Sequence, residues 1–331
     1  ALARVWAHEC LRVYGDRLVS DSHRATLQRL LTNVASDPRG LDLPANKIFT
    51  ASGVITFSDL LSDDSTAQGS GLEQDSSRGL GEPDRMPYVD VTHRLPQIKD
   101  YFTQRLAEFN TDPTKQAQKL VFFEAAQRHV LNAYRTLSQP RANLMLVGVG
   151  GSGRHAVARM GAYLAGLQVR TIHPGPKYDL RAFRDELKGI SRECAIKRSA
   201  TALLVSDDQL MKESFYQDLS ALCLHGHIAN LFTVDEMNGL MDDIRNDAQR
   251  NNVPLTPDSL LAYFIARFRA HFHLVICMSP SDTAFAQRCA SFASMLSTCT
   301  VQAFSQWPHP ALKQVAQVYL GPALAPNVNT A

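Results

Sequence analysis

The sequence predicts an α/β protein: a mostly parallel five-stranded sheet covered by helices and preceded by a small helical unit. Three observations favour this fold class. Amphipathic helical patterns open the chain, short apolar runs alternate with helical patterns from residue 144 onwards, and a glycine-rich turn follows the first of those runs. With 331 residues, of which 45% are apolar, the chain is long enough for one large domain and a smaller one.

The first third of the chain is expected to be helical with one interruption. Residues 2–36 show helical spacing of leucines in two stretches, with the sequence SDSH as the break between them. Residues 62–86 are mostly Ser, Gly, Asp, Gln and Glu, with too little apolar surface to offset the entropy of ordering, so a disordered insertion or linker is predicted. Two further helices are expected at about 95–110 and 115–137.

Five apolar runs are expected to be strands, because strands buried on both faces read as nearly continuous apolar segments. They are residues 144–149, 167–172, 201–206, 272–278 and 299–304. Helical patterns among them lie at about 154–165, 178–194, 213–225, 236–250 and 258–270. Ligands of such sheets bind at the carboxyl ends of the strands.

Composition makes some partners unexpected. The formal net charge is +2 without a basic stripe, so nucleic acid is not expected. No apolar run reaches the roughly 18 residues that span a bilayer, and the N-terminus is unlike a signal peptide, so no membrane contact and a cytoplasmic location are expected. Helical spacing begins at the second residue without a capping signal, which suggests a piece of a longer chain.

The stretch LMLVGVGGSGRHAV, residues 144–157, carries the main motif. It matches the phosphate-binding pattern G-x-x-x-x-G-K-[S/T], with arginine and histidine in place of the lysine and the hydroxyl residue. In such a loop, amide N–H groups and the positive end of the following helix meet the charge of a phosphate chain. The candidate nucleotide-binding residues are Gly148, Val149, Gly150, Gly151, Ser152, Gly153, Arg154 and His155.

The loop alone leaves two interpretations open, because GVGGSG also satisfies the dinucleotide pattern G-x-G-x-x-G. A Rossmann domain for NAD needs a carboxylate after the second strand, where the sequence reads VRTIHPGP; Arg170 could suit a 2′-phosphate, so an NADP oxidoreductase is one alternative. A P-loop ATPase needs an apolar strand that ends in an acid to hold magnesium, and TALLVSDD ends in Asp207 and Asp208. A solvated aspartate after a buried strand remains the simpler explanation for Asp207 alone.

Three segments together resemble the fourth AAA+ module of dynein heavy chains, and are closer to the axonemal (ciliary) branch. They are LMLVGVGGSGRHAVARMGAYLAG, LLVSDDQLMKESFYQDLSALCLHGHIANLF and FHLVICMSPSDTAFAQRCASFASM; the N-terminal RVWAHECLRVYGDRLVSDSHR is similar to the lid helices of the third module. The resemblance covers nearly the whole chain. It implies a helical lid of the preceding module at 1–61, an insertion at 62–86, and an AAA+ large subdomain at 87–331, with the P-loop at 148–155 in a core of five parallel strands.

The resemblance also implies a function: a segment of a minus-end-directed microtubule motor whose ring contains six AAA+ modules, the fourth being regulatory or structural. The implied partners are neighbouring modules of the same chain and other dynein subunits, and microtubules only through parts outside this sequence. The implied location is the cytoskeleton of the ciliary axoneme. An independent, active P-loop ATPase is the second alternative.

The resemblance assigns roles at the candidate site. Asp207 would hold Mg²⁺, Asp208 stands where active modules have a glutamate, and Ser279 stands at the position of a sensor asparagine. Thr298 replaces the arginine finger that would serve the neighbouring module. An imidazole at His155 cannot give magnesium a hydroxyl ligand. We therefore expect ADP or ATP to be held with weak or absent Mg²⁺ and negligible hydrolysis.

Overall fold

The computed structural model describes most of the chain, in two compact units. The described residues are 2–18, 20–39, 42–49, 55–61, 87–210, 212–281 and 284–324, so the insertion predicted at 62–86 lies outside them. Unit 1 comprises residues 1–117 and 121–131, and unit 2 comprises residues 118–120 and 132–331. The subdomain boundaries at residues 61 and 86 stay a prediction. In the described part of the chain, no helix is both long and apolar enough to cross a membrane.

Unit 1 is helical apart from one short antiparallel strand pair. Its elements are α1 (Leu2–Cys10), the π-helix η1 (Leu11–Gly15), α2 (Asp21–Ser36), α3 (Ala45–Ile48), β1 (Phe57–Ser58), β2 (Val89–Asp90), α4 (Leu95–Thr111) and the first part of α5 (Glu124–Leu137). The break predicted at SDSH, residues 20–23, is confirmed only at its first residue. Ser20 has an extended backbone, and the second helix already begins at Asp21.

The helix predicted at 115–137 is too long at its start, since α5 begins only at Glu124. Before it, the buried Phe122 packs its ring against Phe102 of α4, with the ring centroids 5.3 Å apart. The carbonyl of Phe122 also accepts a hydrogen bond from Nε2 of Gln127 at 3.0 Å. Tertiary packing of this segment therefore overrides a helical spacing of apolar residues.

Unit 2 contains the predicted parallel sheet, and all five predicted strands are confirmed, with ends close to the expected ones. Its elements are β3 (Asn143–Val147), α6 (Arg154–Leu164), β4 (Gln168–Thr171), α7 (Leu180–Ala195), β5 (Thr201–Ser206), α8 (Glu213–His225), α9 (Val234–Arg250), α10 (Pro257–His271), β6 (Phe272–Met278), α11 (Ala284–Ser291), α12 (Ala293–Thr298), β7 (Cys299–Ala303) and α13 (His309–Leu324). The strand order is β4-β5-β6-β3-β7. The sequence interpretation missed α11, α12 and α13.

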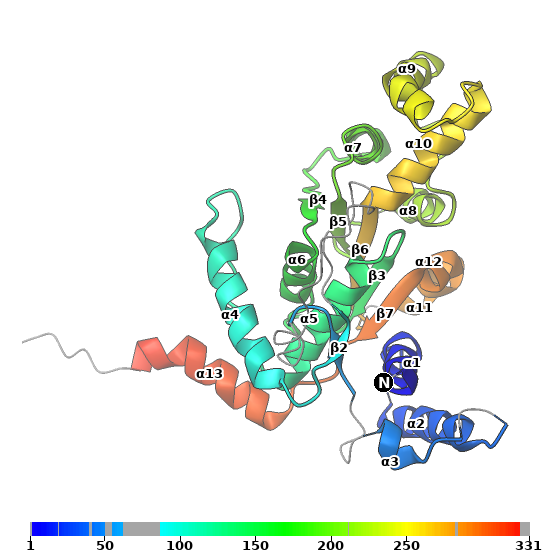
Figure 1. Ribbon diagram of the computed structural model, residues 1–331. Helices are drawn as coiled ribbons and strands as arrows, with labels where there is room; N and C mark the ends of the chain where they lie inside the picture. Colours follow the sequence, from blue (N-terminus) through cyan, green and yellow to red (C-terminus); the bar gives the residue numbers. More distant parts are fainter. Residues whose placement is uncertain are drawn as a thin grey trace, which may run out of the picture. The chain divides into compact units, whose positions relative to one another are not determined.

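Strand β3 lies inside the sheet, between β6 and β7. Its last residue, Val147, is in register with Met278 of β6 and with Ala303 of β7, so these strands end at the same level. The connection from β3 through α6 to β4 runs along the sheet in the direction opposite to the later connections. Because such crossovers are right-handed, α6 covers one face, and α7, α8 and α12 lie on the other (Figure 1).

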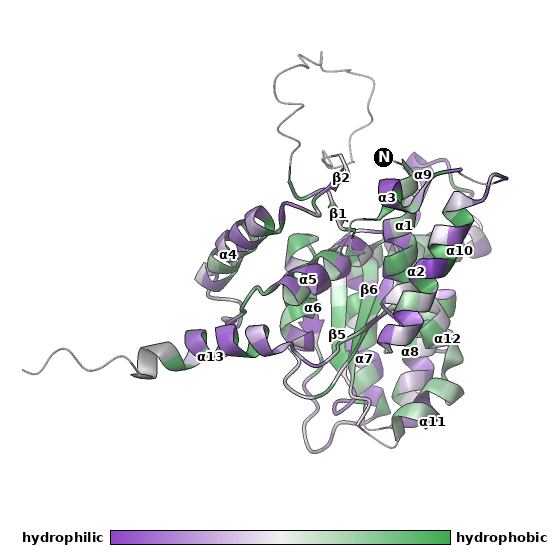
Figure 2. Ribbon diagram, turned by 90° about the horizontal axis from the view of Figure 1, so that it is seen from below, coloured by the Kyte–Doolittle hydropathy of each residue, from purple (hydrophilic) through white to green (hydrophobic). Residues whose placement is uncertain are grey.

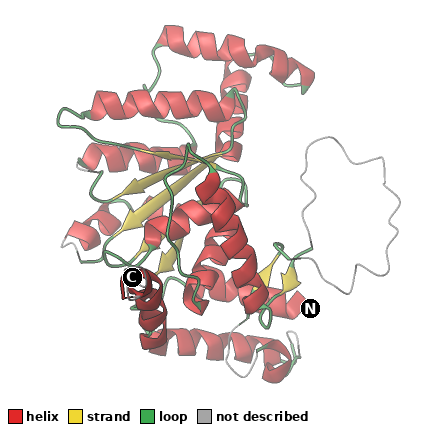
Figure 3. Cartoon of the chain, turned by 90° about the vertical axis from the view of Figure 1, so that its left-hand side faces the viewer, coloured by secondary structure: helices red, strands yellow, loops and turns green. Residues whose placement is uncertain are grey.

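The core of unit 2 lies on both sides of the neighbouring strands β5 and β6. Every residue of β5 and β6 is buried, and Figure 2 shows these strands as mostly hydrophobic segments among helices with polar outer faces. Stacked rings fill one face, with centroids 4.5 Å apart for Phe183 and Phe215 and 4.6 Å apart for Phe268 and Phe272. The strands therefore form the inner layer between helices, as Figure 3 shows, and only their ends reach loops.

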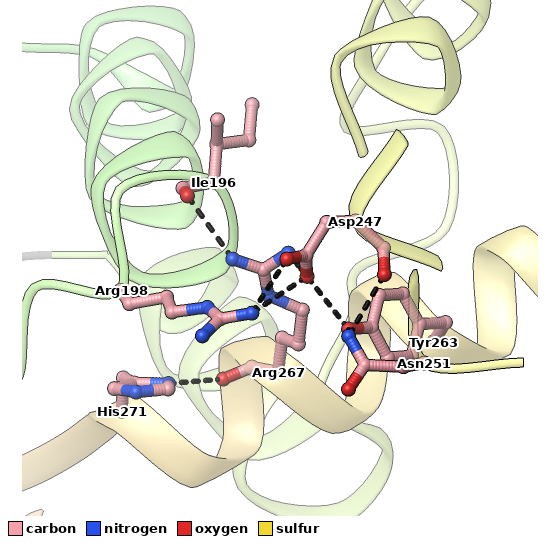
Figure 4. A network of polar contacts seen from close by, with 7 residues as sticks. All are labelled: Ile196, Arg198, Asp247, Asn251, Tyr263, Arg267 and His271. Carbon is pink, nitrogen blue, oxygen red and sulfur yellow. Dashed lines mark hydrogen bonds and ion pairs between the residues drawn. The ribbon is translucent and has the colours of Figure 1, made fainter. Parts of the chain in front are cut away.

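A polar network joins α9 and α10 to the segment that follows α7 (Figure 4). The carboxylate of Asp247 on α9 accepts hydrogen bonds from the Tyr263 hydroxyl at 2.7 Å, Nη2 of Arg198 at 2.7 Å and Nη1 of Arg267 at 2.6 Å. Arg267 also donates to the carbonyl oxygen of Ile196 at 3.1 Å. Hydrogen bonding by Tyr263 is the main cause that lowers the pKa of Asp247. One carboxylate thus fixes three elements to one another.

We expect Asp247→Ala to destabilise unit 2 by about 2 kcal/mol, because it leaves the nearly buried Arg267 without its carboxylate partner. Asp242→Ala on the same helix is the matched control. Its contact with Arg245 at 3.3 Å joins two exposed side chains, and exposed pairs contribute less than about 0.5 kcal/mol. Urea unfolding monitored by circular dichroism measures both changes. Equal losses in the two variants would contradict the assignment.

The same variant makes a pH prediction. Because the pKa of Asp247 is lowered in the folded state, its contribution is present above the unfolded value of about 3.9 and is lost as the pH falls through the folded pKa. The difference in unfolding free energy between the unmodified chain and Asp247→Ala should therefore be full at about pH 6 to 7 and shrink below about pH 4. A difference that stays constant down to about pH 2 would rule out this carboxylate as its source.

Candidate phosphate-binding site

The predicted glycine loop leads from the end of β3 directly into α6. Gly151 and Gly153 have φ angles of 79° and 88°, in the left-handed region that side-chain-bearing residues rarely adopt. Gly153 is the N-cap residue of α6 and makes the turn into the helix. The two glycines therefore set the path of the loop.

Gly148 is required for a different reason, which is close packing. A Cβ atom placed on Gly148 would lie 2.7 Å from Cβ of Phe304 and 2.9 Å from Oγ of Ser152. In the middle of the loop, by contrast, no atom of the described chain comes within 4 Å of a Cβ placed on Gly150 or Gly151. The loop is thus tightly held at its first glycine and open at its centre, where a phosphate group has room.

Two polar groups of the loop are buried and have no hydrogen-bond partner within the part of the chain that the structure describes: Oγ of Ser152 and Nη1 of Arg154. Arg154 is only 8% exposed, and its Cδ lies 3.5 Å from a Cβ placed on Gly148, so its stem runs beside the loop. Burying a guanidinium without an acceptor is costly. An anion bound in the loop would supply that acceptor through a charge-assisted hydrogen bond.

Asp207 lies at the end of β5, where its carboxylate joins the ends of two strands. Its Oδ2 accepts a hydrogen bond from the backbone N–H of Ser279, after β6, at 2.6 Å, and its Oδ1 accepts one from the N–H of Asp208 at 3.1 Å. The backbone N–H of Asp207 donates to the carbonyl oxygen of Cys277 at 3.2 Å. Both carboxylate oxygens are therefore already engaged by backbone donors.

His155 is electrostatically coupled to the groups on both sides of the site. Local desolvation is the main cause that lowers its pKa, and the positive charges of Arg154 and Arg159 add to this. The carboxylates of Asp208 and Asp207 oppose the shift. With its pKa below the ordinary value of about 6.5, the imidazole is neutral at pH 7 and adds no positive charge to the loop.

The structure thus brings together most of the residues singled out in the sequence. The glycine loop follows β3, Asp207 and Asp208 follow β5, and Ser279 follows β6, all at the carboxyl edge of the sheet. Thr298 is not among them, because it precedes β7 and its hydroxyl donates to the carbonyl oxygen of Ser294 at 2.8 Å. Ser279 contributes a backbone N–H to Asp207, a contact that its sensor position did not predict.

The groups at this edge of the sheet differ in the ligands that they offer. His155 offers no hydroxyl oxygen, and each oxygen of Asp207 accepts one backbone N–H and keeps a second lone pair. The open centre of the loop and the buried nitrogen of Arg154, on the other hand, fit a phosphate chain.

The sequence interpretation missed three residues that border the site. Phe304 and Trp307 follow β7 and lie beside the first and last glycines of the loop, Gly148 and Gly153, respectively. They could have been found, because the end of a fifth parallel strand must meet the same edge of the sheet. Gln209 links β4 to β5, since its Nε2 donates to the carbonyl of Ile172 at 2.8 Å and its Oε1 accepts from the N–H of Ser206 at 3.0 Å.

The NADP oxidoreductase alternative is wrong. In a Rossmann domain the strand before the glycine loop pairs with the next strand of the chain, whereas β3 pairs with β6 and β7 and not with β4. Arg170, the candidate for a 2′-phosphate, forms an ion pair with Glu193 of α7 at 2.6 Å.

Comparison with known proteins identifies the family of the chain. The family described as the P-loop containing dynein motor region D4 matches residues 118–330. The chain is 31% identical over 322 residues to the Dynein-1-beta heavy chain of the flagellar inner arm I1 complex of Chlamydomonas reinhardtii. It is 30% identical over 322 residues to Dynein axonemal heavy chain 2 of Mus musculus, and 30% identical over 319 residues to Dynein axonemal heavy chain 1 of Homo sapiens.

These alignments cover 96%, 97% and 96% of this chain, respectively, and 7% of each relative. The chain therefore spans a small part of the length of the heavy chains that it matches. The α/β core with five parallel strands is consistent with the expected AAA+ P-loop fold, and dynein motor regions of this type bind nucleotide in general. The chain belongs to the dynein heavy chain family, within which residues 118–330 match the P-loop containing dynein motor region D4.

Proposed function

We propose that this chain is a segment of an axonemal dynein heavy chain, and that its glycine loop, residues 148–155, holds ADP or ATP with little or no hydrolysis. The observation that carries the proposal is the buried Nη1 of Arg154, which has no partner among the described residues and lies beside a loop with an open centre. In this role the nucleotide supports the structure or regulation of a motor that moves along microtubules.

Retention of nucleotide follows from groups that do not need magnesium. The amides of the loop and the amino end of α6 attract phosphate oxygens, and Arg154 adds a full positive charge that remains at any ordinary pH. A guanidinium can also donate two parallel hydrogen bonds to a phosphate. We therefore propose that Mg²⁺ contributes weakly or not at all to binding.

Slow turnover follows from the side chains around the phosphates. Asp208 is one methylene shorter than the glutamate expected in an active module, and an error of about 1 Å in position can cost roughly a hundredfold in rate. Ser279 cannot replace the amide of an asparagine that would position water, and His155 gives no hydroxyl ligand. Three of the groups that an active site needs are thus replaced together.

The proposal places the chain among larger partners. The names of the relatives describe flagellar and axonemal dyneins, which supports a location in the cytoskeleton of the ciliary axoneme. Because the chain spans about 7% of these relatives, its partners would be neighbouring AAA+ modules of the same polypeptide and other dynein subunits. Microtubules would be bound by other parts of the parent chain.

The nucleotide proposal is tested by titrating ADP into the 331-residue chain in a calorimeter. We expect binding whose affinity changes less than about threefold between Mg²⁺ and EDTA, because Arg154 and the loop amides carry the interaction. Arg154→Ala should weaken binding by roughly tenfold to a hundredfold, since hydrogen bonds to charged groups contribute about 1.5–3 kcal/mol. Arg170→Ala, which removes an exposed arginine paired with Glu193, is the control and should leave the affinity unchanged. Absence of ADP binding by the unmodified chain would refute the proposal.

A second experiment addresses hydrolysis. The unmodified chain should release phosphate from ATP at a negligible rate, whereas Arg154→Lys, His155→Thr and Asp208→Glu together should raise Mg²⁺-dependent release by at least about tenfold. Adding Asp207→Asn to the triple variant is the control, because it removes the proposed metal ligand and should abolish the gain. Rapid release by the unmodified chain would show an active ATPase instead.

The neutral state of His155 makes a prediction about pH. Because its pKa is lowered, the ring gains charge only at acidic pH, where it would add attraction for phosphate. The affinity for inorganic diphosphate, divided by that of His155→Gln at the same pH, should be near one at about pH 7.5 and higher at an acidic pH well below about 6.5. Taking this ratio cancels the protonation of the ligand. A ratio that is equally large at both pH values would contradict the assigned charge state.

A further inference from the structure

One short segment after β7 contacts both ends of the glycine loop. A Cβ placed on Gly148 would lie 2.7 Å from Cβ of Phe304, and a Cβ placed on Gly153 would lie 3.9 Å from Cζ2 of Trp307. The centre of the loop, at Gly150 and Gly151, is free of such contacts from the described part of the chain. The segment 304–307 therefore packs closely on the loop where it leaves the strand and lies beside it where it enters the helix.

This segment is itself fixed at both of its ends. The backbone N–H of Phe304 donates to the carbonyl oxygen of Val147 at 2.7 Å, which continues the ladder between β7 and β3. After Trp307, the carbonyl of Pro308 accepts the N–H of Ala311 at 2.9 Å, in the first turn of α13, and Ala311 is buried. The side chains of Phe304 and Trp307 are half-buried between these two attachment points.

The loop needs such support, because its sequence gives it little shape of its own. Glycine loses more conformational freedom on ordering than any other residue, and four of the six residues from Gly148 to Gly153 are glycines. Within the loop, the backbone of Ser152 donates to the carbonyl of Val149 at 3.2 Å, and the N-cap residue Gly153 has no side chain to bond the helix amides. Ordering the loop at the moment of binding would lower the affinity for a ligand.

We infer that Phe304 and Trp307 are positioning residues that hold the glycine loop in its phosphate-binding conformation, a role that rests on the proposed nucleotide function. Phe304 pairs through its backbone with Val147, the residue before the first glycine, and packs closely against Gly148. The indole ring of Trp307 lies beside Gly153, the residue whose left-handed backbone turns the chain into α6. The support should affect the affinity for the diphosphate group, and this effect should not depend on the base that the ligand carries.

Calorimetric titration of inorganic diphosphate and of ADP tests the role of Trp307. Trp307→Ala should weaken both ligands by the same factor, roughly tenfold, because both bind the loop that has lost its support. Trp307→Phe should restore most of the affinity. Phe232→Ala, which removes another half-buried ring on the segment between α8 and α9, is the matched control and should leave both affinities unchanged.

The outcomes separate this inference from the proposed function. If Trp307→Ala weakens ADP alone, the ring contacts the base or ribose and the inference is overturned; unchanged affinity for both ligands also overturns it. If the unmodified chain binds neither ligand, the proposed nucleotide function itself fails.

A second measurement does not depend on the folding of Trp307→Ala. The chain contains two tryptophans, Trp6 and Trp307, so Trp6→Phe leaves Trp307 as the single reporter of the loop. Saturating diphosphate should change the emission of this tryptophan, with the midpoint of the change at the affinity found by calorimetry. Diphosphate binding with no change in emission would overturn the inference.

Discussion

The parallel pairing of β3 between β6 and β7 is the constraint on which the rest of unit 2 depends. It places Val147, Met278 and Ala303 at one level, so the residues that follow these strands meet at a single edge of the sheet. The glycine loop, the backbone of Ser279 and the segment 304–307 owe their proximity to this register. A slip of one residue would turn each strand's side chains to the opposite face and separate these groups.

At this edge of the sheet, the backbone of the glycine loop and the charge of Arg154 lie side by side. The proposed anion site needs the open space at the centre of the loop, and the stem of Arg154 lies beside the first glycine, Gly148. The guanidinium is largely buried. In this position its attraction for a phosphate is screened less than it would be at the surface. Since arginine stays protonated when it is buried, this charge persists, whereas a lysine could lose its proton.

The sequence predicted the sheet well, because β5 and β6 are buried on both faces and their composition shows it directly. It failed where long-range packing decides the structure. The apolar segment before α5 has helical spacing but is not helical, because Phe122 packs on Phe102. The short helices α11 and α12 are separated at Phe292 and carry no long periodic pattern.

Some features of the candidate site could likewise be predicted from the sequence, and others could not. The glycine pattern and Asp207 are visible in the sequence, since each depends on local geometry at the end of a strand. The burial of Arg154 is not visible, because charged residues are normally solvated and only the fold shows that its stem lies beside the glycine loop. The contact of Trp307 with Gly153 likewise joins residues that are far apart in the sequence.

The presence of Asp207 does not by itself indicate that the site binds magnesium or hydrolyses a nucleotide. Its two oxygens bond the backbone N–H groups of Ser279 and Asp208, and so connect the end of β5 to the end of β6. Replacing this carboxylate would leave a backbone donor without its partner, a penalty that exists whether or not a nucleotide is cleaved. The presence of glycine at Gly153 also has a structural reason that does not depend on hydrolysis, because a left-handed turn is needed there before α6 can begin. Both features thus have structural reasons that do not depend on hydrolysis, and this is why the proposed binding without turnover is physically consistent.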